Sequence, residues 1–236
     1  MQLTCFKAYD IRGKLGAELN TAIAYRIGRA FADVMGARQV VLGRDNRHSS
    51  AELAQAVARG LQDAGAAVLD LGLAGTEEMY FATTHFGACG GIEITASHNP
   101  IDYNGMKIVK AGSAPLDSAT ELAAIRIAAE AETPPPAAIP GGTYDIRAES
   151  RAAYVDAVLS FVDTAHLRPL RVLVNAGHGS AGPTFDALAD RLLAQGAPLD
   201  IRRMFHLPDG RFPQGIPNPL LLENQQVTSD ALRAVR

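Results

Sequence analysis

Short apolar runs alternate with segments of helical spacing along most of this chain. Residues 40–42 and 67–69 are apolar runs, and between them residues 51–64 place apolar side chains near a period of 3.6. Residues 77–86 predict a further helix, and residues 92–95 predict a third strand. This alternation is typical of an α/β protein whose sheet is largely parallel or mixed. We therefore expect the α/β fold class.

Three consecutive prolines at 134–136 mark the clearest domain boundary. Proline has no amide donor, so the prolines end the helix predicted over 117–131. Beyond them the pattern restarts with a helix near 150–161, a strand at 171–174, a helix at 183–193 and a strand near 199–202. A length of 236 residues allows one large domain or two small ones. We predict domains at 1–142 and 143–236, the second with too few strands to be complete.

Composition excludes several classes of partner. The 22 basic and 25 acidic residues give a net charge of −3, so no basic surface favours nucleic acid or an anionic membrane. Cys5 and Cys89 are too few for a disulfide framework or a paired zinc site. The N-terminus lacks a signal-peptide pattern, and no apolar stretch approaches the roughly 18 residues of a membrane span. We expect a reduced, cytoplasmic protein with neither nucleic acid nor membrane as a partner.

The most informative segment is residues 90–100 (GGIEITASHNP). A buried strand there ends in a short polar loop that presents Ser97 and His98. Open α/β sheets bind ligands at the carboxyl ends of their strands, so Ser97 is a candidate reactive group. The alternative is an ordinary turn. Direct adjacency of the serine and the histidine argues against an acylating pair, whose members are usually distant in sequence.

A lysine follows this loop after a short interval. Asn104-Gly105 between apolar residues is a hairpin-turn signal, and Lys107 would begin the strand after that turn. A solvated lysine on a hairpin is the alternative interpretation. If the chain returns tightly toward Ser97, the Lys107 ammonium lies beside a phosphoryl group carried there.

An arginine near the N-terminus is a second candidate anion ligand. Residues 6–13 (FKAYDIRG) combine an aromatic hydroxyl, the carboxylate of Asp10 and the guanidinium of Arg12. The planar fork of arginine donates two parallel hydrogen bonds to anions. The alternative is an edge strand with Asp10 and Arg12 facing solvent.

Two further polar segments follow strands. Residues 43–50 (GRDNRHSS) supply two cations, although a helix cap, with Ser49 or Ser50 accepting from free amides, explains the pattern equally well. Residues 175–182 (NAGHGSAG) are a glycine-rich turn between a strand and a helix. Helix-terminal amides there would suit a phosphate, but a tight turn is the favoured interpretation.

Taken in order, five motifs resemble one family. They are residues 6–13, 95–100, 104–107 (NGMK), 208–213 (PDGRFP) and 217–220 (PNPL). Together they resemble the α-D-phosphohexomutase superfamily, in its phosphomannomutase/phosphoglucomutase branch. The resemblance runs through essentially the whole chain. It implies three-layer α/β/α domains with mixed sheets, namely domain I with a phosphoserine loop and domain II.

The resemblance also implies a chemistry. Its bacterial members interconvert mannose 6-phosphate and mannose 1-phosphate for GDP-mannose and exopolysaccharide synthesis. Ser97 would be the phosphoserine that exchanges its phosphoryl group through a hexose 1,6-bisphosphate, with a phosphoryl oxygen on Mg²⁺. His98 and Lys107 would handle charge and protons, and Tyr9 and Arg12 would line the site. This agrees with phosphoryl transfer, which chiefly needs positioned cations and an in-line nucleophile.

One departure from the family pattern shapes the expectation. The family's Asp-Gly-Asp metal loop is expected beyond residues 217–220, and residues 209–211 are not that loop. We therefore expect the N-terminal half of the enzyme, inactive alone and missing its C-terminal half. Exposed apolar surface on domain II would favour self-association. The alternatives are phosphoglucomutase activity, or a non-catalytic module that binds phosphosugars or a partner.

Overall fold

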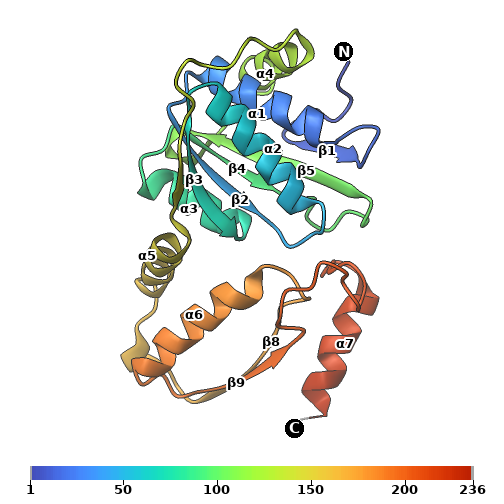
Figure 1. The fold of residues 1–236 in the computed structure, drawn as a ribbon. Coiled ribbons are helices and arrows are strands. Elements are labelled where there is room, and N and C mark those ends of the chain that lie inside the picture. Colours follow the sequence, from blue (N-terminus) through green and yellow to red (C-terminus); the bar gives the residue numbers. More distant parts are fainter. Residues whose placement is uncertain (1, 235–236) are drawn as a thin grey trace. The chain divides into compact units, whose positions relative to one another are not determined.

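The computed structural model describes residues 2–234, which form two compact units divided after Ser150 (Figure 1). The division lies later than the boundary expected after Gly142. The reason is that strand β7 (Thr143–Asp145) pairs with β3 (Ala67–Leu73) and so belongs to the first sheet. Ile146 is then buried in the core of the same unit. The chain therefore leaves the first unit only after β7 has completed the sheet.

The first unit is built on one mixed sheet of seven strands in the order β1-β5-β4-β2-β3-β7, with β6 paired to β5. Strands β4, β2, β3 and β7 run parallel to one another, whereas β5 is antiparallel to both β1 and β4. The other elements are β1 (Ile11–Lys14), α1 (Thr21–Met35), β2 (Gln39–Arg44), α2 (Ser50–Asp63), α3 (Thr76–His85), β4 (Gly90–Ile94), β5 (Tyr103–Lys110), a single 3-10 turn (Ala111–Ser113), β6 (Ala114–Pro115) and α4 (Glu121–Glu130). The predicted α/β class with a mixed sheet is confirmed.

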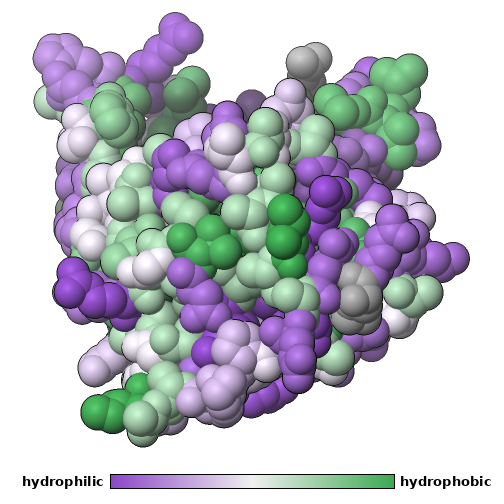
Figure 2. Space-filling model, turned by 90° about the horizontal axis from the view of Figure 1, so that it is seen from above, coloured by the Kyte–Doolittle hydropathy of each residue, from purple (hydrophilic) through white to green (hydrophobic). Residues whose placement is uncertain are grey.

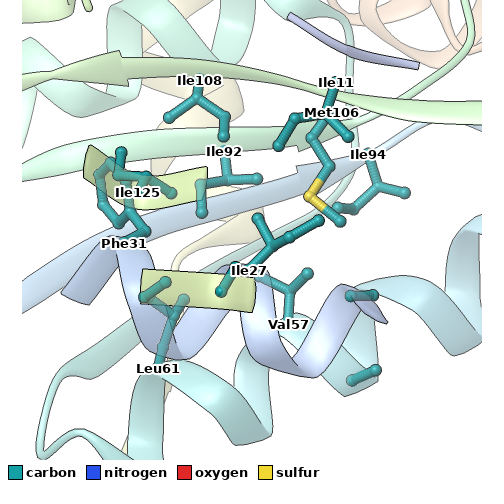
Figure 3. Packing of buried hydrophobic residues seen from close by; sticks show 14 of the residues in the cluster. Ile11, Ile27, Phe31, Val57, Leu61, Ile92, Ile94, Met106, Ile108 and Ile125 are labelled. Carbon is teal, nitrogen blue, oxygen red and sulfur yellow. The ribbon is translucent and has the colours of Figure 1, made fainter. Parts of the chain in front are cut away.

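Helices cover both faces of this sheet, which makes three layers. Alternate strand residues point to opposite faces, so Val40 and Leu42 join one apolar cluster and Val41 joins another. Figure 3 shows the first cluster, in which side chains of α1, α2 and α4 pack beneath β4 and β5. The labelled members are Ile11, Ile27, Phe31, Val57, Leu61, Ile92, Ile94, Met106, Ile108 and Ile125. The second cluster places Met79 of α3 against the opposite face.

Helices and strands predicted between residues 40 and 95 are confirmed to within a few residues, but the predicted hairpin turn at Asn104-Gly105 is wrong. Both residues lie inside β5. Asn104 is completely buried, and its side-chain amide donates hydrogen bonds to the hydroxyls of Ser49 and Ser50. A Cβ added at Gly105 would lie 2.1 Å from the carbonyl oxygen of Ile11, so glycine is needed there for the close approach of β1. The helix predicted from residue 117 begins at Glu121, because Asp117 instead organises a turn before it.

The second unit contains a short parallel sheet. Strand β8 (Leu170–Asn175) runs parallel to β9 (Leu199–Met204), and α6 (Ala181–Ala194) connects them. Helix α5 (Arg147–Leu159) and a 3-10 turn (Thr164–His166) precede β8, and α7 (Leu222–Arg233) follows a proline-containing loop. Among the described residues, α7 buries none of its side chains. The apolar side chains of this helix therefore stay at least partly accessible to solvent.

Apolar side chains are exposed on both units. Figure 2 shows one face of the molecule, on which hydrophobic side chains gather between hydrophilic ones. Large exposed hydrophobic residues in and just before α7 are Leu220, Leu221, Leu222, Val227 and Leu232. Within residues 2–234, no helix combines the length and the apolar character needed to span a bilayer.

The contact between α1 and α2 yields a test of the packing. A Cβ added at Gly60 would lie 2.1 Å from the carbonyl oxygen of Tyr25 and 2.7 Å from the amide nitrogen of Arg29. Helix propensity alone would make Gly60→Ala stabilising by about 1 kcal/mol. We predict instead a loss of about 1–3 kcal/mol in the free energy of unfolding, because the backbones must separate.

Urea unfolding measures this difference. The control is Arg59→Ala at the neighbouring exposed position, which should change the free energy of unfolding by less than about 0.5 kcal/mol. A stabilised Gly60→Ala protein would show that the two helices are not in close backbone contact.

Candidate functional site

The loop that carries Ser97 joins β4 to β5 and lies at the carboxyl edge of the sheet. Because β2 and β4 are parallel neighbours, the residues that follow β2 reach the same edge. The Asp45 amide donates a hydrogen bond of 2.9 Å to the carbonyl of Ile94, which fixes the two segments together. Ser97 and His98 are both exposed. Ser97 therefore lies where sequence analysis expected it.

The backbone of Ser97 is in the left-handed region, with φ at +52°. For a residue with a Cβ this conformation costs roughly 1–2 kcal/mol. Two contacts compensate: the Ser97 amide donates to Thr95 Oγ1 at 2.9 Å, and the Asn99 amide donates to the Ala96 carbonyl at 3.0 Å. A non-glycine residue held in this conformation is a frequent mark of a functional position.

Arg47 holds the loop from inside. Only 2% of the residue is exposed. Its guanidinium donates hydrogen bonds to four loop carbonyls, those of Ser97 (2.9 Å), Asn99 (2.6 Å), Pro100 (2.9 Å) and Tyr103 (3.2 Å). Burial lowers the pKa of Arg47, an effect that the nearby Asp45 opposes and the positive charge of Arg12 adds to. Sequence analysis interpreted residues 43–50 as a source of two cations or as a helix cap, and missed this contact.

Asp45 and two serines support Arg47 from the start of α2. Asp45 Oδ1 accepts hydrogen bonds from the Arg47 amide at 3.0 Å and from the Ser50 hydroxyl. The Asn104 amide group donates to the hydroxyls of Ser49 (2.8 Å) and Ser50 (2.9 Å). Ser49 occupies the N-cap position of α2, as the alternative interpretation of this segment expected, but its side chain makes no capping hydrogen bond. Both hydroxyls serve the contact between α2 and β5 instead.

Arg12 offers a donor at the same edge. Arg12 lies in β1 opposite Gly105 of β5. Its Nη2 donates a hydrogen bond of 2.8 Å to Asp10 Oδ2. The side chain is only 12% exposed, so the alternative in which Arg12 faces solvent is wrong. Within residues 2–234, its Nη1 is buried and makes no hydrogen bond. One arm of the guanidinium thus lacks a partner among these residues, and an anion that entered the site would supply one.

The remaining predicted residues differ in how closely they approach Ser97. His98 Nδ1 lies 3.3 Å from Ser97 Oγ. Lys107 is half-buried in β5, directly opposite Glu93 in β4. Tyr9 is 87% exposed in the loop before β1. In the described part of the chain, neither Lys107 nor Tyr9 is hydrogen-bonded to Ser97.

Glu93 is a feature that sequence analysis missed. It lies in β4 with 1% exposure, and a Cβ added at Gly43 would lie 2.1 Å from its Oε2. Neither carboxyl oxygen has a hydrogen-bond partner among residues 2–234. Burial raises the pKa of Glu93 well above its usual value, and the negative charges of Asp45 and Glu78 raise it further. The signal in the sequence was a single acidic residue between two isoleucines of a buried strand.

The described residues do not form a magnesium site by themselves. Within residues 2–234, no group of three or more histidine, cysteine, aspartate or glutamate side chains is placed to hold a metal. Magnesium prefers an octahedron of oxygen ligands, often from one or two carboxylates with phosphate and water. Mg²⁺ bound through a phosphoryl group on Ser97 stays a prediction.

The motifs of the second unit have mainly structural roles. The turn predicted after β8 has Gly177 in the left-handed region, and a Cβ there would lie 2.5 Å from the Pro217 side chain. A Cβ at Gly182 would lie 1.9 Å from the His206 carbonyl oxygen. Asp209 pairs with Arg211, whose hydrogen bonds lower the pKa of that carboxyl. These contacts favour the tight-turn interpretation of the glycine-rich segment.

Comparison with known proteins identifies the family. Two family models, described as phosphoglucomutase/phosphomannomutase α/β/α domain I and domain II, match residues 3–134 and 152–236. The chain belongs to the phosphoglucomutase/phosphomannomutase family. The resemblance drawn from the sequence motifs is thereby confirmed.

Relatives in this family match the chain over nearly its whole length. It is 50% identical over 232 residues to a phosphomannomutase of Escherichia coli K12, which covers 98% of this chain and 51% of the relative. It is 48% identical to phosphohexose mutases of Xanthomonas campestris, over 99% of this chain and 50% of theirs. A crystal structure of a family protein from Burkholderia thailandensis superimposes with a TM-score of 0.79 at 36% identity, covering 98% of this chain and 50% of that one. The chain spans about half the length of these relatives.

The buried carboxyl of Glu93 yields a pH prediction. Its pKa is raised in the folded chain, so the folded state binds more protons than the unfolded state between the two pKa values. Stability is therefore highest below the unfolded pKa of the carboxyl and falls as pH rises toward the folded pKa. We predict that Glu93→Gln, which cannot ionise, gains stability relative to the wild type as pH rises.

Urea unfolding between pH 4 and pH 8 tests this prediction. Glu52→Gln, at an exposed position of α2, is the matched control and should follow the wild type at every pH. Parallel curves for Glu93→Gln and the wild type would contradict the raised pKa.

Proposed function

We propose that this chain carries the phosphoserine site of a phosphohexomutase that interconverts mannose 6-phosphate and mannose 1-phosphate. One observation supports this most strongly: Ser97 is exposed at the carboxyl edge of the sheet, in a left-handed conformation, and its carbonyl accepts a hydrogen bond from a buried arginine. A serine that accepts and donates a phosphoryl group must be accessible, and its geometry must be fixed in advance.

The proposed reaction begins with phosphorylated Ser97. A hydroxyl of the hexose monophosphate attacks the phosphorus, the bond from phosphorus to Ser97 Oγ breaks, and the proton that the sugar hydroxyl loses is matched by the proton that the serine oxygen gains. The resulting hexose 1,6-bisphosphate turns over. Ser97 Oγ then attacks the other phosphate, so the product leaves and the phosphoserine is restored with no net use of phosphate.

The neighbouring side chains supply protons and positive charge in this scheme. His98 Nδ1, at 3.3 Å, gives the serine oxygen its proton in the first step and accepts it in the second. The Nη1 of Arg12, which has no partner among residues 2–234, donates to a phosphoryl oxygen. Lys107, together with His98, balances charge and transfers protons at the phosphoryl group. The exposed Tyr9 lines the part of the site that receives the sugar. Mg²⁺ would supply further positive charge at the phosphoryl group.

The sugar and the pathway are part of the same proposal. The name of the E. coli relative favours mannose phosphates. We propose further that the mannose 1-phosphate serves GDP-mannose and exopolysaccharide synthesis in the cytoplasm. Glucose phosphates are the second candidate, because the family description includes phosphoglucomutases. Rates on mannose 1-phosphate and glucose 1-phosphate, compared in the full-length protein that carries this sequence, decide between them.

The serine assignment is tested by Ser97→Ala in that full-length protein. We predict a loss of mutase turnover of about 10³-fold or more, because no other group takes the place of the nucleophile. The measurement is the coupled conversion of mannose 1-phosphate to mannose 6-phosphate. Ser113→Ala is a matched control, because Ser113 is also left-handed, with φ at +58°, and should keep full activity. Turnover that survives in Ser97→Ala would refute the assignment.

The 236-residue chain by itself should behave differently. It spans about half the length of the E. coli relative and, within its described residues, lacks a metal-binding cluster. We predict no steady formation of mannose 1-phosphate by the isolated chain, and self-association through the exposed apolar residues in and before α7. Steady turnover would contradict the first expectation, and a monodisperse monomer in light scattering would contradict the second.

A further inference from the structure

Arg47 is the residue at this site whose role the proposed function leaves open. It is buried, and its side chain reaches into the concave side of the Ser97 loop. Each terminal nitrogen serves two carbonyls: Nη1 donates to Pro100 and Tyr103, and Nη2 donates to Ser97 and Asn99. A terminal guanidinium nitrogen has two hydrogens, so these four contacts use all of them. Arg47 therefore has no terminal donor left for a phosphoryl group.

The loop depends on a planar fork at this point. Four carbonyl oxygens converge on the guanidinium, and their dipoles would repel one another without a cation between them. Lysine has one nitrogen with three donors and no planar fork, so it cannot satisfy four converging carbonyls. One of the four belongs to Ser97, whose left-handed backbone needs support. Without the guanidinium, the backbone of Ser97 should therefore be the first to leave its left-handed conformation.

We propose that Arg47 is a positioning residue for phosphoryl transfer. It holds the carbonyls of the Ser97 loop inward and thereby presents Ser97 Oγ outward, without contacting the phosphoryl group. The proposal rests on the proposed role of Ser97 as the phosphoserine. The two arginines then have different roles, since Arg47 holds the loop, whereas Arg12, whose buried Nη1 has no partner in the described part of the chain, is the proposed anion ligand.

Arg47→Lys is the direct test, and Arg29→Lys is its matched control. Arg29 is also buried, at 7% exposure, and donates to two backbone carbonyls, those of Asp63 at the end of α2 and Pro135 in the segment after α4. Replacing Arg29 by lysine removes a guanidinium that bridges backbone carbonyls in another part of the same unit. Asp45→Asn is a milder second variant, because it weakens the ion pair to Arg47 (3.6 Å) and leaves the guanidinium in place.

The first readout is amide hydrogen exchange in the 236-residue chain. The amides of Ser97, Asn99 and Tyr103 are hydrogen-bonded within the loop. In Arg47→Lys we expect them to exchange at least about tenfold faster, with a smaller change of the same direction in Asp45→Asn. Arg29→Lys should leave them unchanged. Unchanged exchange in Arg47→Lys, or in Asp45→Asn if the lysine variant does not fold, would overturn the proposal.

The second readout is the rate at which Ser97 takes up phosphate from glucose 1,6-bisphosphate in the full-length protein, followed by intact mass. We expect about a 100-fold slower uptake in Arg47→Lys and a normal rate in Arg29→Lys, since small misplacements of a reacting atom have effects of this size. Faster loop exchange with an unchanged uptake rate would overturn the proposal. If the wild-type protein takes up no phosphate, the role of Ser97 fails, and the exchange data still decide whether Arg47 holds the loop.

Discussion

The architecture of the site depends on one buried guanidinium meeting a ring of backbone carbonyls. Strands β2 and β4 are parallel, so the segment after β2 and the loop after β4 come to the same edge of the sheet. The chain must then reverse direction, because β5 runs antiparallel to β4. A reversal this tight turns several backbone carbonyls toward the side chain of Arg47, and carbonyls that face the protein need donors. Arg47, in the segment after β2, supplies four of those donors.

The site also contains three features that usually lower the stability of a folded protein. Ser97 occupies a left-handed conformation, Arg12 keeps a buried nitrogen without a partner in the described residues, and Glu93 is buried with a raised pKa. Local rules are commonly broken where a protein binds or reacts, because the remaining structure compensates for the cost. Here the compensation comes from the three-layer first unit, in which helices cover both faces of the sheet. The strained loop is therefore held by a rigid support.

Sequence patterns predicted most of the strands and helices of the first unit but only part of the site. Apolar periodicity indicated the strands and helices between residues 40 and 95, and motif order indicated Ser97 as the central residue. Asn104-Gly105 misled the prediction, because a local turn signal is overridden when the asparagine is buried by α2. Arg47 was missed because its partners are backbone carbonyls some 50 residues away, and such contacts leave no local pattern. Side chains that bind main chain across a sheet become visible only once the fold is known.

The account rests on Ser97 as the one residue that carries phosphate, and phosphate-site mapping tests this most directly. The full-length protein that carries this sequence is incubated with glucose 1,6-bisphosphate, digested and sequenced by fragmentation mass spectrometry. The account predicts a single phosphate, located on Ser97 within the loop that Arg47 holds. Phosphate on any other residue, or none at all in a folded protein, would contradict it.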